Sequence, residues 1–267
     1  MTSRFRGNGP RSSDSKAPTQ GAQRPPARAY QPIVTWREAE WQAAVSPVEQ
    51  ALGLSLSPAQ QDLLARYMVM LHHWNSTYNL TAVRDAPDML SHHLADCLAV
   101  LAPLGRHLAD AQAQAGAATG APAGQGGFRL LDVGSGGGLP GVVLAICRPE
   151  VQVTCVDTVG KKAAFIRQVA AELRLPNLRA EHARVETLKT AFNLITSRAF
   201  ASLPDFVGLT RSLLAPGAVW MAMKGKLPED EQAALPADVE VFHVEQLQVP
   251  QLDAERCLIW MRPCAAA

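Results

Sequence analysis

Glycine residues interrupt one apolar stretch of the chain in a pattern that suits ligand binding, LLDVGSGGGLPG at residues 130–141. Glycines at 134, 136 and 138 permit a tight turn and close approach of a ligand, and a following helix offers unpaired N–H groups. A dinucleotide-binding loop would place its third glycine at 139, where this chain has Leu139. The GxGxG spacing, through Gly134 and Gly136, instead favours S-adenosyl-L-methionine, which has a carboxylate and no pyrophosphate.

An acidic residue, Asp157, ends the next apolar segment, 23 residues after Gly134. At that place a carboxylate can accept hydrogen bonds from both ribose hydroxyls of an adenosine. The alternative is that Asp157 caps a helix starting near Gly160. Asp132 precedes the glycines and is expected either to orient the loop or the methionyl amine, or to serve as structural support.

A single arginine, Arg198, follows the fourth apolar segment in the sequence ITSRAF. Its guanidinium could fix the cofactor or the edge of a guanine, or it could simply form an ion pair in a loop. The segment has neither the Asn-Pro-Pro-Tyr signature of exocyclic-amine methyltransferases nor a Pro-Cys nucleophile. His93 and Asp96 lie one helical turn apart and could hold each other, although a structural histidine is the commoner outcome.

Two further groups of side chains could contact a nucleic acid. Aromatic and amide groups in WNSTYNLT could stack on or bond to a nucleotide, although aromatic residues that close a helix more often belong to a core. Lysines could bind phosphate, although each alone is more often a solvated surface residue. These residues are Trp74, Tyr78, Asn79, Lys161, Lys162, Lys224 and Lys226.

Strand and helix patterns alternate from Phe128 onward, which predicts a doubly wound α/β domain. Five strands joined by helices are expected to be parallel, and the last two, joined by a short loop, should form an antiparallel hairpin. Such a C-terminal hairpin is typical of class I methyltransferases with a Rossmann-like, seven-stranded sheet, rather than of nucleotide dehydrogenases. The predicted strands are 128–134, 151–157, 178–183, 192–197, 218–225, 239–247 and 256–262.

Composition divides the chain into four parts. Residues 1–30 are rich in Ser, Pro, Gly and Arg and predict a disordered basic tail. Residues 31–108 have helical periodicity, with Ser57 as N-cap and Pro58 at the first helical position, and predict an N-terminal helical cap. The Ala-, Gly- and Gln-rich segment 109–127 is expected to be a flexible loop, and 128–264 is expected to form a methyltransferase domain.

Charge is distributed unevenly, although the net charge is +1. Residues 158–226 carry 11 basic and 4 acidic side chains, whereas the chain from Leu227 onward carries 2 basic and 8 acidic ones. The basic part could meet phosphate. The five cysteines have no metal-ligand spacing, so we expect no metal and buried thiols. Without a membrane-spanning run or a secretory signal, a cytoplasmic location is expected.

Taken together, these motifs resemble the RsmG (GidB) family of bacterial small-subunit ribosomal RNA methyltransferases. The resemblance covers nearly all of the chain outside the tail and the 109–127 insert, which both depart from the family pattern. The matching segments are WNSTYNLTAVRD (74–85), LSHHLADCL (90–98), DVGSGGGLPG (132–141), GKKAAFIRQVAAEL (160–173), ARVE (183–186), SRAFASL (197–203) and MKGK (223–226).

The resemblance implies methylation of a guanine at N7 in 16S rRNA, guanine 527 in the usual ribosomal numbering, with S-adenosyl-L-methionine as methyl donor. It also implies that Gly134, Leu139, Val185, Glu186 and Arg198 contact the cofactor or shape its pocket. Free 16S rRNA or the small ribosomal subunit would be the partner. Two alternatives stay open: a methyltransferase of the same fold acting on a protein or a small molecule, and a non-catalytic RNA-binding assembly protein.

Overall fold

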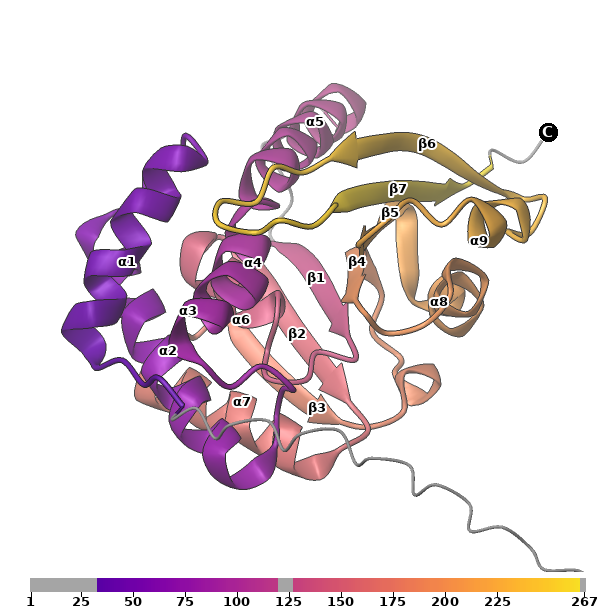
Figure 1. Cartoon of the computed structure of the whole chain (residues 1–267). Coiled ribbons are helices and arrows are strands. Elements are labelled where there is room, and N and C mark those ends of the chain that lie inside the picture. Colours follow the sequence, from indigo (N-terminus) through magenta and orange to yellow (C-terminus); the bar gives the residue numbers. More distant parts are fainter. Residues whose placement is uncertain (1–32, 120–126, 265–267) are drawn as a thin grey trace, which may run out of the picture. The chain divides into compact units, whose positions relative to one another are not determined.

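One seven-stranded sheet organises the protein, and its strand order is β3-β2-β1-β4-β5-β7-β6. The computed structural model describes residues 33–119 and 127–264, so the predicted tail 1–30 lies outside the described residues (Figure 1). Strands β1 to β5 pair in parallel, and β7 lies antiparallel between β5 and β6, which confirms the predicted class. The strands are β1 (Phe128–Val133), β2 (Val151–Asp157), β3 (Leu178–His182), β4 (Phe192–Arg198), β5 (Leu214–Lys224), β6 (Val239–Gln246) and β7 (Cys257–Pro263).

Side chains alternate between the two faces of this sheet and build a hydrophobic cluster on each. Leu130 and Leu194 belong to one cluster, whereas their chain neighbours Leu131 and Ile195 belong to the other. All four are fully buried. The central strands are therefore continuous apolar runs, as expected for parallel strands covered on both faces.

Crossover helices cover these two faces. Helices α6 (Gly141–Cys147) and α7 (Gly160–Glu172) contact α2 (Pro58–Tyr78), so all three share the first cluster. Helix α8 (Leu203–Thr210) and the short α9 (Glu229–Ala233) lie on the other side, as Figure 1 shows. Because β1 pairs in parallel with both β2 and β4, the carboxyl ends of these three strands lie at the same edge of the sheet.

The predicted cap consists of several helices that pack on the sheet through the first cluster. Ser57 caps α2 as expected, because its hydroxyl accepts a hydrogen bond from the Gln60 amide at 3.2 Å. The elements are α1 (Glu38–Ala51), α2, α3 (Ala86–Met89), the π-helical η1 (Leu90–Ala95), α4 (Asp96–Leu98) and α5 (Leu101–Thr119).

The 109–127 segment requires a correction. Helix α5 continues to Thr119, so residues 109–119 are helical and not a loop. Alanine has the highest helix propensity of any residue, and the alanines of this stretch favour helix despite its low complexity. The next residues, 120–126, lie outside the described part of the chain. Arg106 anchors α5 to the C-terminal hairpin through an ion pair with Glu245 at 2.6 Å.

Four of the five cysteines are buried, as expected, but Cys264 is exposed. Within the described ranges, three or more His, Cys, Asp or Glu side chains nowhere gather in a way that could hold a metal ion. A search of the described helices also finds none with the length and apolar character needed to span a membrane.

Candidate functional site

The glycine loop links the end of β1 to α6 and is held against the end of β2. The amides of Gly134 and Ser135 both donate to the Val156 carbonyl, at 2.9 and 3.3 Å. Gly134 has a φ of +68°, and a Cβ on it would lie 2.4 Å from a ring carbon of Phe200. Gly138 has a φ of +91°, and its Cβ would meet Val142 at the same distance. Both backbone conformation and space therefore demand glycine at these two positions.

Asp157 lies beside this loop and is 7% exposed. Its Oδ2 accepts a hydrogen bond from the Gly136 amide at 3.0 Å, and its Oδ1 accepts one from the Val159 amide at 2.8 Å. The Lys162 ammonium lies 3.8 Å from Oδ2. The alternative expectation of a helix cap is not met, because α7 begins after Val159 with no side-chain cap and Asp157 accepts from the amide of Val159 itself, which precedes the helix. Each carboxylate oxygen still has acceptor capacity for a hydroxyl group.

A cavity of about 490 Å³ opens between these elements at the carboxyl ends of the strands. Ligands of open α/β sheets bind at this edge, and the volume is in the usual range for small molecules, about 300–1,000 Å³. The lining residues are Val133, Gly134, Val156, Asp157, Thr158, Val159, Lys162, Ala183, Arg184, Val185, Glu186, Ala199, Phe200 and Leu209.

Four of the predicted cofactor residues line this cavity: Gly134, Asp157, Val185 and Glu186. The other three do not. Gly136 lies just behind, donating to Asp157. Leu139 is buried in the first hydrophobic cluster, and Arg198 directly precedes the lining residue Ala199.

Phe200 is a lining residue that the sequence reasoning did not select as a site residue. Phe200 belongs to the SRAFASL segment, so this motif could have indicated a functional residue. Its closeness to Gly134 could not be predicted, because the two residues are far apart in the chain. Lys224 holds the next residue by donating to the Ala201 carbonyl at 2.9 Å. Lys224 also pairs with Glu231 at 2.8 Å. These contacts give Lys224 a structural role, in place of the phosphate contact considered from the sequence.

Asp132 is fully buried beneath the loop. Its Oδ2 accepts a hydrogen bond from the Gly141 amide at 2.9 Å, which fixes the start of α6. Its Oδ1 has no hydrogen-bond partner among residues 33–119 and 127–264. Burial raises the pKa of the Asp132 carboxyl to about 7. The bond to Gly141 is consistent with both expected roles of Asp132, orienting the loop and structural support.

The Arg198 guanidinium points toward the N-terminal helices. Its Nη1 donates to Asp96 Oδ2 at 3.0 Å and to the His92 carbonyl at 2.8 Å. His93 and Asp96 do not pair, and His93 is the structural histidine that was the commoner expectation: its Nε2 lies 2.6 Å from the Thr81 hydroxyl. Asp96 is instead paired with Arg198 and Arg256.

The remaining nucleotide candidates have mixed surroundings. Trp74 packs against Phe165 with ring centroids 5.3 Å apart and belongs to the core side of α2, whereas Tyr78 is 41% exposed. Asn79 ends α2 in a left-handed conformation and accepts a hydrogen bond from Arg84. Lys161 and Lys226 are exposed.

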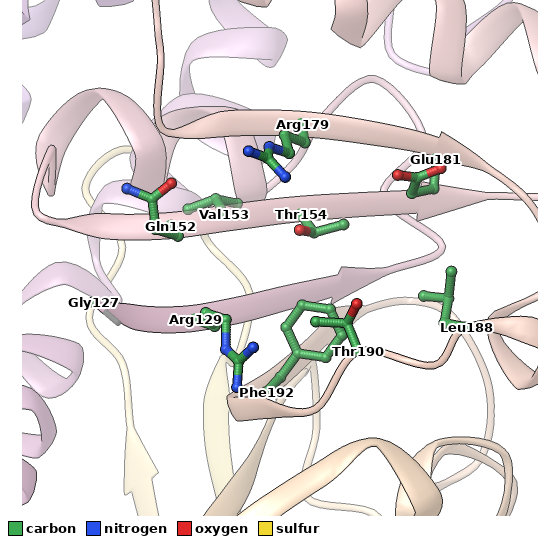
Figure 2. Close-up of a pocket in the computed structure, with 10 residues that line it drawn as sticks. All are labelled: Gly127, Arg129, Gln152, Val153, Thr154, Arg179, Glu181, Leu188, Thr190 and Phe192. Carbon is green, nitrogen blue, oxygen red and sulfur yellow. The ribbon is translucent and has the colours of Figure 1, made fainter. Parts of the chain in front are cut away.

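A second cavity, of about 520 Å³, lies near the amino ends of β1 and β2. Figure 2 shows Arg129, Thr154 and Arg179 on three neighbouring strands around it. This cavity contains neither the glycine loop nor Asp157. The cavity at the carboxyl ends of the strands is therefore the better candidate for the functional site.

The strand order, the antiparallel hairpin and the glycine loop beside an acidic strand end define a class I methyltransferase fold. A family model described as "GidB: rRNA small subunit methyltransferase G" matches residues 60–259. The chain belongs to this family.

Relatives named "Ribosomal RNA small subunit methyltransferase G" agree with this assignment. The one from Acidovorax sp. (strain JS42) is 60% identical over 215 residues, covering 80% of this chain and 92% of the relative. The one from Leptothrix cholodnii (strain ATCC 51168 / LMG 8142 / SP-6) is 60% identical over 219 residues, covering 82% and 94%. A crystal structure of TrmN from Thermus thermophilus is 19% identical, with a TM-score of 0.41 over 51% of this chain and 44% of that chain.

Proposed function

We propose that this protein transfers a methyl group from S-adenosyl-L-methionine to N7 of a guanine in 16S rRNA, guanine 527 in the usual ribosomal numbering. The observation that carries the proposal is the cavity at the strand ends, where Gly134 and Asp157 meet in a chain of the GidB family. Family membership supports the reaction class and the rRNA substrate. The position of the guanine rests on the resemblance alone.

The residues around the cavity fit the cofactor. The absence of a side chain at Gly134 lets the Phe200 ring lie close to the loop backbone, and both residues line the cavity. Asp157 has acceptor capacity for the two ribose hydroxyls, and Val185 and Leu209 offer apolar walls for an adenine. When bound, S-adenosyl-L-methionine supplies an electrophilic methyl group on a sulfonium. Glu186 lines the same cavity, and Arg198 directly precedes the lining residue Ala199.

Guanine N7 has an in-plane lone pair and carries no hydrogen, so its methylation requires no catalytic base. The protein must hold the two reactants in line and tolerate the positive charge that moves onto the purine. An unpaired guanidinium at Arg198 would repel that charge. The Arg198 guanidinium is instead bound to the buried Asp96 carboxylate, which Arg256 shares, and Arg198 does not line the cavity. These contacts support Arg198 as a residue that positions the turn beside the cavity and does not itself contact the reactants.

Basic side chains near the cavity support an RNA substrate. Arg184 lines the cavity and its side chain is 76% exposed, while Lys161 and Lys226 are exposed on neighbouring segments. Arginine and lysine at such positions bind phosphate oxygens and fix the orientation of the nucleic acid. We propose a cytoplasmic protein that acts on 16S rRNA, either free or in the small subunit.

The test uses purified protein, methyl-labelled S-adenosyl-L-methionine and small subunits from cells that lack this protein. We expect label in 16S rRNA and, after borohydride reduction and aniline cleavage, one new stop in reverse transcription. Ribosomal protein and small-molecule fractions serve as competing acceptors. Label in those fractions alone would mean that the substrate is a protein or a small molecule and not rRNA. A lack of S-adenosyl-L-methionine binding in calorimetry would refute the methyltransferase activity itself.

A further inference from the structure

A buried carboxylate, Asp96, joins three segments that are distant in the sequence. Asp96 is 2% exposed. Its Oδ2 accepts from Arg198 at the end of β4, and its Oδ1 accepts from Nε of Arg256 just before β7, each at 3.0 Å. Asp96 itself begins α4 among the N-terminal helices. A buried charge is very costly unless it is paired. The two ion pairs therefore fix Asp96, Arg198 and Arg256 relative to one another.

The helix that carries Asp96 has an unusual shape at this point. Residues Leu90–Ala95 form a π-helix, which is rare, and such turns are frequent at functional sites. The π-helical turn brings the His92 carbonyl and the His93 ring to the same guanidinium that Asp96 binds. His92 O accepts from Arg198 at 2.8 Å, and His93 Nδ1 lies 3.4 Å from its Nη2.

His93 does not add another charge to this cluster. Burial lowers the pKa of His93 to about 4, so the ring is neutral at neutral pH. Its Nε2 lies 2.6 Å from the Thr81 hydroxyl. The Thr81 amide in turn donates to Asn75 Oδ1 at 2.8 Å. The Arg198 end of the cluster is thereby fixed to α2 as well as to η1.

The position of Arg198 matters for the cavity because the chain turns sharply after it. Ala199 has a φ of +52°, a conformation that a residue with a side chain rarely adopts, and both Ala199 and Phe200 line the cavity. Arg198 is the last residue of β4, so its side-chain contacts fix where this strained turn begins.

We propose that Asp96 is a positioning residue of the methyl transfer, which fixes the Arg198 guanidinium and the following turn at the edge of the cofactor cavity. Arg256 holds Asp96 from the opposite side, so the site is complete only when both the N-terminal helices and the C-terminal hairpin are docked. The inference deepens the proposed function and rests on it for the kinetic readout.

The test compares Asp96→Asn, which keeps the shape and removes the charge, with Asp238→Asn as the matched control. Asp238 also pairs with an arginine, Arg211 at 2.5 Å, but it is exposed and is not among the residues that line the cavity. Misplacing a positioned group costs on the order of tenfold to 100-fold in rate. We expect Asp96→Asn to lower kcat by that factor with little change in the KM for small subunits, and Asp238→Asn to leave both unchanged.

A double-mutant cycle separates positioning from a general loss of structure. If Asp96 acts through Arg198, the double variant Asp96→Asn, Arg198→Lys should lose no more activity than Arg198→Lys alone. The reason is that Arg198→Lys already removes the guanidinium that Asp96 positions. Additive losses, or an Asp96→Asn enzyme with wild-type kcat, would overturn the proposal. If Asp96→Asn does not fold, Arg256→Gln enters the same cycle in its place.

A second readout does not depend on methylation. In nitrogen-15 NMR spectra the Arg256 Nε–H signal reports its bond to Asp96, and the Arg198 side-chain signals report the other half of the cluster. Arg198→Lys should shift the Arg256 signal, because both arginines share one carboxylate, while Arg211→Lys should not. An Arg256 signal indifferent to Arg198→Lys would refute the cluster, whereas lack of methylation by the wild-type enzyme would refute only the proposed function.

Discussion

The Gly136 amide donates a hydrogen bond to the Asp157 carboxylate at 3.0 Å, and this contact joins the loop after β1 to the end of β2. The same carboxylate accepts from the Val159 amide before α7. Two separate signals in the sequence, the glycines and the acidic strand end, are therefore parts of one structural unit. Replacing either partner should disturb the other.

Asp157→Ala should weaken S-adenosyl-L-methionine binding by about 10-fold to 100-fold. Hydrogen bonds to a charged group contribute roughly 1.5–3 kcal/mol each, and a factor of ten corresponds to about 1.4 kcal/mol. Calorimetric titration measures the Kd directly, and Asp205→Ala, an acidic residue outside the cavity lining, serves as control. An Asp157→Ala protein with unchanged Kd would place the ribose elsewhere.

Gly134→Ala should destabilise the protein more than Gly53→Ala does. Both glycines have a similar positive φ, +68° and +62°, but only at Gly134 would the new Cβ meet an atom, Phe200 at 2.4 Å. Gly53→Ala therefore reports backbone strain alone, about 1 kcal/mol, and Gly134→Ala adds about 1–3 kcal/mol for overpacking. Urea unfolding measures both. Equal losses would mean that Phe200 yields without cost.

Asp132→Asn should change how stability depends on pH. The pKa of Asp132 is raised to about 7 by burial, so the folded protein holds this proton more tightly than the unfolded chain does. The stability that this raised pKa contributes to the folded protein is fully present below about pH 4 and is lost as the pH rises toward 7. His72, His93 and His107, whose pKa values are lowered, produce the opposite slope.

The difference between wild type and Asp132→Asn isolates the effect of this one carboxyl, because the histidines are common to both proteins. Urea unfolding of the unliganded proteins between pH 4 and 8 should show wild type losing stability relative to the variant as pH rises. A constant difference across that range would show that Asp132 keeps an ordinary pKa.

Thr210→Val should cost about 1–3 kcal/mol of stability without affecting the cofactor Kd. The Thr210 hydroxyl is fully buried, accepts from the Trp220 indole at 2.9 Å and donates to the Phe206 carbonyl at 2.6 Å. Its loss leaves a buried indole N–H unpaired. The exposed Thr187, which donates to the Arg184 carbonyl, provides the control Thr187→Val, expected to change stability by about 0.5 kcal/mol or less. A shift in cofactor affinity for Thr210→Val would connect this core to the site.

The strands and the glycine loop were predictable because their signals are local. Short apolar runs, the glycines and Ser57 each specify the conformation of a few neighbouring residues, and the structure has strands and a capped helix at those positions. The roles of the cofactor-site residues remain predictions, although four of the seven lie together around one cavity.

The parts that sequence reasoning missed depend on non-local contacts or on weak propensities. Asp96 and Arg198 are 102 positions apart, and nothing in either neighbourhood indicates that they pair. No distinct residue pattern marks the π-helical turn at Leu90–Ala95. The helical periodicity of residues 31–108 therefore predicts helix here without this turn. In 109–119, composition alone suggested a loop where alanine favours helix.

Strand β7 lies between β5 and β6, although it follows both in the chain. A nascent polypeptide that has been synthesised only as far as β6 thus has no neighbour for that strand, and it also lacks Arg256. Any chain truncated before Arg256 would expose the edge of β5 to intermolecular pairing and leave Asp96 with a single cation. Premature termination late in the message should therefore yield an inactive, aggregating product and not a shortened enzyme.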